Sequence, residues 1–121
     1  MKLSTLEELL ATPTAEETTE VVEVEGLGTV RIKAYSADEF LQARKAATEK
    51  GEFDQARWGA MTLHLCVVEP ALTYDQAVQL RRRPSFLIDA LLDAIGRLSG
   101  ISVSGNVLEE AVDDAERTFR T

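Results

Sequence analysis

The spacing of hydrophobic and polar positions changes along the chain, from alternation to a helical period. Residues 21–35 alternate, and Gly26 and Gly28 supply the positive φ angles of a tight loop between the two halves. Residues 36–121 instead repeat their apolar positions every three or four residues. The pattern predicts an α+β fold, mainly α, in which a β-hairpin precedes a bundle of about five short helices in one globular domain, 21–121.

The predicted hairpin has a register in which both faces are satisfied. With Leu27 at the centre of the turn, Val24 pairs with Val30 on an apolar face. The same register places Glu23 opposite Arg31 on the other face, and opposite charges at facing positions stabilise a strand pair.

Capping signals give the boundaries of the predicted helices. Ser36 with Glu39 and Thr73 with Gln76 have the spacing of capping boxes, and Asp54 is a third N-cap candidate. Glycines at 51 and 100 are the predicted helix stops. The predicted helices cover 36–50, 55–68, 74–82, 84–99 and 106–119.

Two of these helices carry clear apolar stripes. The helix over 84–99 has the wider one, which predicts a central position in the core. Its stripe consists of Leu87, Leu91, Ile95 and Leu98, with Ile88 and Leu92 beside it. The helix over 55–68 has a predicted buried face of Trp58, Met61, Leu65 and Val68.

Residues 1–20 are predicted to form a flexible acidic arm ahead of this domain. Ser4 and Glu7 have capping-box spacing, Pro13 ends the helical turn, and the Thr- and Glu-rich segment that follows favours mobility. The arm either docks on a partner or packs back against its own core. The candidate partner-binding residues on its apolar side are Leu3, Leu6, Leu9 and Leu10.

The net charge of −8 limits the classes of partner. Acidic residues concentrate at the two ends of the chain, and this balance opposes binding to nucleic acid or to an anionic membrane surface. No apolar run approaches the roughly 18 residues of a membrane span. A single cysteine, Cys66, in an apolar run fits a buried free thiol in a reducing cytoplasm.

The residues with reactive side chains form no recognisable catalytic or metal motif. His64 is the only histidine, and it lies two positions from Cys66, so the two point to different sides of a helix. Asp89 and Asp93 share a helix face, but they have no third ligand nearby in sequence. We therefore expect no catalytic, cofactor-binding or metal-binding residues.

The most concentrated basic feature is the triplet Arg81, Arg82 and Arg83, which precedes Pro84. A helix-turn-helix interpretation is disfavoured, because the would-be recognition helix over 84–99 carries two aspartates and one arginine. The triplet is a second candidate partner-binding site. It could cap a helix end, or bind an acidic partner or the acidic terminus of a neighbouring copy.

The order of several segments resembles a known family. A valine-rich hairpin leads into a Ser-Ala-Asp-Glu helix start, Val67-Val68-Glu69-Pro70-Ala71-Leu72 follows at a helix exit, and then comes Leu91-Leu92-Asp93-Ala94-Ile95-Gly96-Arg97-Leu98-Ser99-Gly100. Over roughly residues 20–105 this resembles the small tail assembly chaperones of long-tailed bacteriophages and prophages, especially the XkdN-like group.

The resemblance implies a non-catalytic protein of the host bacterial cytoplasm. Such chaperones are thought to coat the helical tape-measure protein in many copies, keep it soluble until the tail tube polymerises, and be absent from the mature virion. In many, a longer form made by translational frameshift engages the tube protein. Acidic termini that meet basic patches on the next copy would also give self-association.

Other function classes stay open at this point. A different phage tail or neck component, structural or adaptor, is the main alternative, and its presence in purified virions would distinguish it. An acidic inhibitor or nucleic-acid mimic is another, although the middle of the chain is nearly neutral. An enzyme would require a polar pocket around His64.

Overall fold

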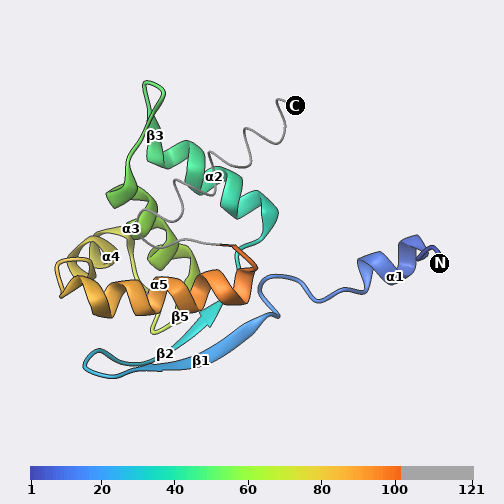
Figure 1. Cartoon of the computed structure of the whole chain (residues 1–121), viewed down its shortest axis with the longest axis horizontal. Coiled ribbons are helices and arrows are strands. Elements are labelled where there is room, and N and C mark those ends of the chain that lie inside the picture. Colours follow the sequence, from blue (N-terminus) through green and yellow to red (C-terminus); the bar gives the residue numbers. More distant parts are fainter. Residues whose placement is uncertain (102–121) are drawn as a thin grey trace.

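The computed structural model describes residues 1–101 and confirms the predicted fold class, α+β and mainly α (Figure 1). The predicted helix over 106–119 lies outside the described residues. In chain order the elements are α1 (Leu6–Leu10), β1 (Thr19–Val24), β2 (Gly28–Lys33), α2 (Ala37–Ala47), β3 (Thr48–Glu49), β4 (Glu52–Phe53), α3 (Gln55–Cys66), β5 (Val67–Glu69), α4 (Tyr74–Leu80) and α5 (Ser85–Ser99).

The hairpin is present, but its predicted register is wrong by two residues. Val24 pairs with Gly28, and Glu23 therefore lies opposite Thr29. The loop is centred one residue earlier than expected, because the N–H of Leu27 donates to the carbonyl of Val24 at 2.9 Å. A two-residue shift leaves every side chain on its predicted face, because side chains alternate between the faces with a period of two. The prediction of one apolar face is therefore still correct.

A third strand, β5, joins the hairpin and corrects the predicted end of the helix over 55–68. The helix stops at Cys66, and Val67 then pairs with Ile32 in a sheet of order β1-β2-β5. Arg31 consequently forms its ion pair with Glu69 of β5, at 3.4 Å, and not with Glu23. Consecutive β-branched valines ahead of a proline suit a strand better than a helix end.

The predicted cap of α2 is confirmed and its predicted end is wrong. Ser36 and Glu39 form a complete capping box. The helix ends at Ala47, and β3 and β4 then form a small hairpin that turns at Lys50 and Gly51, with φ angles of 52° and 79°. Two consecutive positive φ angles define a two-residue hairpin turn, so Gly51 serves that turn and is not a helix stop.

The caps of α3 and α4 are also confirmed. The Asp54 carboxylate accepts from the N–H groups of Ala56 and Arg57 at 2.9 and 3.2 Å, and Thr73 and Gln76 form a capping box. The predicted buried face of α3 is only partly right: Trp58 is buried, whereas Met61 and Leu65 are half-buried. Because α2, α4 and α5 all contact α3, its buried side is wider than one stripe and also includes Thr62, Leu63 and Cys66.

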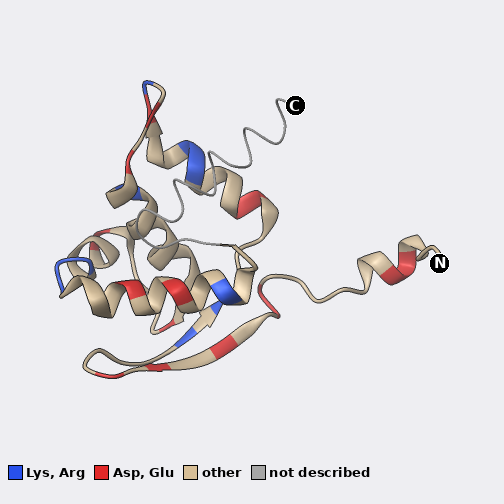
Figure 2. Ribbon diagram, in the orientation of Figure 1, with Lys and Arg blue, Asp and Glu red and all other residues tan. Residues whose placement is uncertain are grey.

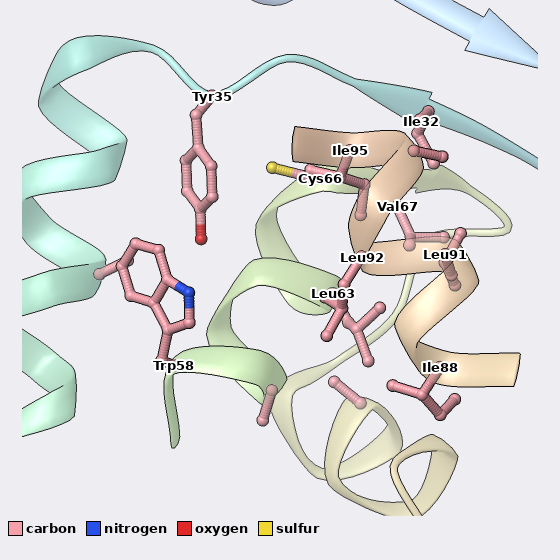
Figure 3. Packing of buried hydrophobic residues seen from close by; sticks show 14 of the residues in the cluster. Ile32, Tyr35, Trp58, Leu63, Cys66, Val67, Ile88, Leu91, Leu92 and Ile95 are labelled. Atoms are coloured by element: carbon pink, nitrogen blue, oxygen red, sulfur yellow. The ribbon is translucent and has the colours of Figure 1, made fainter. Parts of the chain in front are cut away.

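Helix α5 has the central position that its apolar stripe predicts. Leu87, Leu91 and Ile95 are buried, and Leu98 packs at the edge of the same cluster. Figure 3 shows Leu91 and Ile95 among the buried residues of this core. Gly100 ends the helix with a left-handed φ of 73°, as expected, whereas the helix begins at Ser85, one residue after the predicted start at Pro84. The helix packs against both the sheet and α3, so it has a central position in the core.

Tyr35 joins the sheet to three helices. Its ring stacks on the ring of Trp58 of α3 (Figure 3) and meets the ring of Phe40 of α2 edge-on, with both ring centroids 5.8 Å away. Its hydroxyl is 2.7 Å from Thr62 Oγ1, and its N–H donates to Ser99 Oγ of α5 at 2.9 Å. Burial raises the pKa of Tyr35 well above its ordinary value, so the hydroxyl is neutral.

The Tyr35–Thr62 hydrogen bond gives a test of this junction. Tyr35→Phe should lower the free energy of unfolding by about 1–2 kcal/mol, because the buried hydroxyl of Thr62 loses its partner. Adding Thr62→Val to Tyr35→Phe should cost much less than Thr62→Val alone, since no polar group is then left unpaired. Urea unfolding of the wild type, both single variants and the double variant measures the coupling, and strictly additive effects would contradict the junction.

A buried ion pair fixes the connection from β2 to α2. Lys33, 8% exposed in its side chain, donates to Glu39 and also to the Ala34 carbonyl at 3.0 Å. Partial burial by itself raises the pKa of Glu39, but the hydrogen bonds from Lys33 and Ser36 and the Lys33 charge outweigh burial. The net pKa of the Glu39 carboxyl is therefore below its ordinary value.

Glu39→Gln should accordingly lower stability by about 1–3 kcal/mol at neutral pH, because it leaves the buried Lys33 charge unpaired. A lowered folded-state pKa contributes stability above the unfolded-state pKa and loses it as pH falls through the folded-state value. The difference between wild type and variant should therefore shrink below about pH 5. Asp38→Asn, one residue earlier on the first turn of α2 but exposed, is the control and should show a much smaller effect in urea melts across pH.

Candidate interaction surfaces

The N-terminal leucines form an exposed arm that the rest of the described chain does not cover. Leu3, Leu6, Leu9 and Leu10 are 86%, 69%, 62% and 77% exposed, and none belongs to the core cluster. The arm therefore does not pack back against its own core. We call residues 1–11 the leucine arm.

The predicted cap of this arm is displaced by one residue. Thr5, not Ser4, is the N-cap of α1, and its hydroxyl accepts from the N–H of Glu8 at 3.2 Å. With about 100° between successive residues, Leu6, Leu9 and Leu10 share one side of the short helix and the two glutamates lie opposite. The helix is thus amphipathic, with its apolar side in solvent.

The segment that follows holds α1 away from the body. Figure 1 shows α1 at one end of the longest axis, joined by an extended stretch to the start of β1. Within that stretch, the Thr14 hydroxyl donates to Glu17 at 3.0 Å and the Thr18 hydroxyl donates to the Thr14 carbonyl at 2.8 Å. These bonds form a local turn immediately before Thr19.

The arginine triplet divides into one packed and two exposed side chains. Arg81 is half-buried and lies across Gly59 of α3, where a Cβ would come within 2.7 Å of its Nε. That Nε is buried and has no hydrogen-bond partner among residues 1–101. Arg82 and Arg83 are exposed on the connection between α4 and α5. The expected three-residue patch is therefore a two-residue patch, because Arg81 is used for packing.

Gly59 tests this packing. In an Arg81→Ala background, Gly59→Ala should stabilise the protein by about 0.5–1 kcal/mol, since alanine is more stable than glycine in the interior of a helix. In the native background the added methyl must displace Arg81, so the gain should be cancelled or reversed. Thermal unfolding of the four proteins measures this difference, and an equal effect of Gly59→Ala in both backgrounds would count against the packing.

A shallow groove on the surface contains one prominent aromatic residue, Phe86. The groove, about 520 Å³, runs between β1 and α5 and includes Val22, Phe86 and Ala90. Phe86 is 70% exposed although it is large and apolar. Phe86 was not among the residues predicted from the sequence to bind a partner. The available signal was a large apolar residue outside the stripe of a strongly amphipathic helix.

The residues with reactive side chains are distributed between the interior and the surface of the fold. His64 Nδ1 donates to the Leu72 carbonyl at 2.7 Å, which ties α3 to the segment after β5. Cys66 is buried, as expected, and burial raises the pKa of its thiol to about 12. Asp89 and Asp93 are exposed on α5. Over residues 1–101, no three His, Cys, Asp or Glu side chains gather in a geometry that could hold a metal ion.

Charge is distributed unevenly along the longest axis. Figure 2 shows acidic residues on α1, β1 and α5, and a basic cluster on the connection between α4 and α5, at the end of the molecule opposite α1. None of the helices within the described range has both the length and the apolar character needed to cross a membrane. Comparison with protein-family models, with curated proteins and with solved structures gives no match.

Proposed function

We propose that this chain is a non-catalytic phage tail assembly chaperone. In the host cytoplasm, many copies bind the tape-measure protein and keep it soluble until the tail tube forms, and the chaperone does not enter the mature virion. A longer frameshifted form would recruit the tube protein. The observation that carries the proposal is the leucine arm, which presents apolar side chains to solvent on an otherwise well-packed domain.

The arm has the chemistry that a helical client requires. A tape-measure protein ahead of assembly exposes long amphipathic helices, and apolar surface of that kind aggregates unless it is covered. Leucines at positions 6, 9 and 10 lie at helical spacing, as in helices that bind an apolar stripe on a partner. Glu7 and Glu8, on the opposite side of α1, would keep the covered client in solution.

The segments that carry the family resemblance belong to the scaffold of the domain. Residues 67–72 contain β5 and the connection to α4, and residues 91–100 contain most of α5 and its glycine cap. Leu91, Leu92 and Ile95 of the second segment are buried, so these residues define a core and are not available to a client. The resemblance therefore concerns the scaffold, and the client-binding surface lies elsewhere on the chain.

Co-expression with the tape-measure protein of the same tail operon tests the proposal. Leu9→Ser should weaken binding about tenfold or more and reduce the soluble tape-measure protein, because burial of one leucine contributes roughly 1.5–3 kcal/mol. Leu41→Ser, on α2 with 51% exposure, is the matched control and should leave binding unchanged.

The measurements are the soluble fraction of the client and the number of chaperone copies recovered with it. Many copies per client, lost with Leu9→Ser but not with Leu41→Ser, is the expected result. Equal loss in both variants would remove the arm from the mechanism. Recovery of this chain in purified virions would favour a tail or neck component instead.

A further inference from the structure

Strand β1 is an edge of the three-stranded sheet, and its outer side is open. The sheet has the order β1-β2-β5, so within residues 1–101 no strand pairs with β1 on the side away from β2. Figure 1 shows the leucine arm leading away from β1. An open edge of this kind offers unpaired N–H and C=O groups to a strand of another molecule.

The hydrogen-bond register identifies the backbone groups at this edge. The N–H of Ala34 donates to the carbonyl of Thr18 at 2.9 Å, and the two residues continue the register of β1 and β2. Because hydrogen-bonded pairs alternate along an antiparallel ladder, the even-numbered residues of β1 bond to β2. The N–H and C=O groups of Thr19, Val21 and Glu23 therefore face the open side, and all three residues are exposed. We call these three residues the β1 edge.

The β1 edge adjoins the groove between β1 and α5. Helix α5 contributes Phe86, Ala90 and Ala94, which lie four residues apart on one side of the helix. Val22, half-buried on the face of β1 toward α5, adds to the apolar lining. Side chains of a strand alternate between its two faces, so a strand added at the edge would place every second side chain against α5. Those side chains would cover Phe86, which is 70% exposed.

The charges of the groove favour a basic segment as its occupant. Glu23 and Glu25 line the groove at its hairpin end, and both are exposed. Farther along, Asp93 and Arg97 carry opposite charges, so the excess charge of the groove is negative. Facing side chains of neighbouring strands interact, so a lysine or arginine opposite Glu23 is favoured and a carboxylate there is disfavoured.

We propose that the β1 edge and the adjoining groove bind an extended segment of a partner protein in which apolar and basic residues alternate. The segment adds a fourth strand to the sheet, with apolar side chains on Phe86 and Ala90 and a basic side chain opposite Glu23. In such strand addition, backbone hydrogen bonds give affinity and the alternate side chains give specificity. A second copy of β1 is disfavoured, because β1 carries two glutamates and no basic residue.

Six-residue peptides of alternating valine and lysine, acetylated and amidated at their ends, test the proposal. Helix α5 rises about 16 Å from Phe86 to Arg97, the length of about five strand residues, so these peptides span the groove. One control peptide has three valines followed by three lysines, and another alternates valine and glutamate. In NMR titrations, the valine–lysine peptide should bind about tenfold more tightly than either control. Equal binding of the block-order peptide would show attraction by charge alone and overturn the proposal.

Amide hydrogen exchange reports the strand pairing directly. The N–H groups of Val21 and Glu23 should exchange rapidly in the free protein, and saturating peptide should slow both about tenfold or more. The N–H of Val22, which faces β2, should change little. Slow exchange at Val21 and Glu23 in the free protein at every concentration would show that the same chain covers the edge, and slow exchange only at high concentration would show pairing of two copies. Either outcome overturns the proposal.

Two variants separate the backbone contact from the apolar contact. Val21→Pro removes an outward N–H and no bond to β2, so it should weaken peptide binding about tenfold, whereas Val21→Ala keeps the N–H and should bind nearly as the wild type does. Phe86→Ser should also weaken binding about tenfold, and Leu41→Ser, an exposed leucine of α2, is its control. Unchanged binding in both Val21→Pro and Phe86→Ser would place the peptide elsewhere on the chain.

A charge reversal tests the selectivity. Glu23→Lys/Glu25→Lys should reverse the preference, so that the valine–glutamate peptide binds more tightly than the valine–lysine peptide. Glu7→Lys/Glu8→Lys makes the same change of net charge on α1 and should keep the wild-type preference. The same shift of preference in both variants would mean that net charge, and not the groove, selects the peptide.

The groove and the leucine arm are separate surfaces, so this inference goes beyond the proposed function and fails independently of it. Leu9→Ser should leave peptide binding unchanged, and loss of peptide binding in that variant would overturn the inference. The effect of Leu9→Ser on the tape-measure protein concerns the proposed function alone.

Discussion

The contacts of Tyr35 are the constraint on which the rest of the domain depends. Its backbone follows directly from β2, its ring packs between α2 and α3, and its N–H bonds to the end of α5. A buried aromatic side chain with a satisfied hydroxyl can contribute packing and direction together. The sheet therefore has one fixed position relative to the three helices. Lys33 lies two residues before Tyr35 and Glu39 four residues after it, and the ion pair between them stabilises the same connection.

The residues that form the core are different from the apolar residues that are exposed on the surface. Inside, apolar side chains from β2, α3 and α5 form one cluster, which includes Cys66. His64 forms a hydrogen bond with the carbonyl of Leu72. Outside, the leucine arm and Phe86 expose apolar area that the domain does not use for its own stability. A protein that binds a partner through such elements can release it without unfolding, because the elements that bind are not those that stabilise the fold.

The arginine triplet shows how packing can divide a uniform sequence feature. Three identical neighbours have the same charge and the same intrinsic preferences, so nothing in their order distinguishes them. Gly59, more than twenty residues earlier, leaves room for one guanidinium against α3. Arg81 fills that space, and only Arg82 and Arg83 of the triplet remain exposed.

Local signals in the sequence determined the fold class and most helix starts, and tertiary contacts decided the rest. Capping is set within four residues, so Ser36, Asp54 and Thr73 could be identified from spacing alone. The strand after Cys66, the hairpin at Gly51 and the hairpin register depend on partners far along the chain or on turn geometry, which periodicity does not encode. The exposure of the leucine arm was likewise open in the sequence, because an apolar stripe has the same pattern whether its partner is its own core or another molecule.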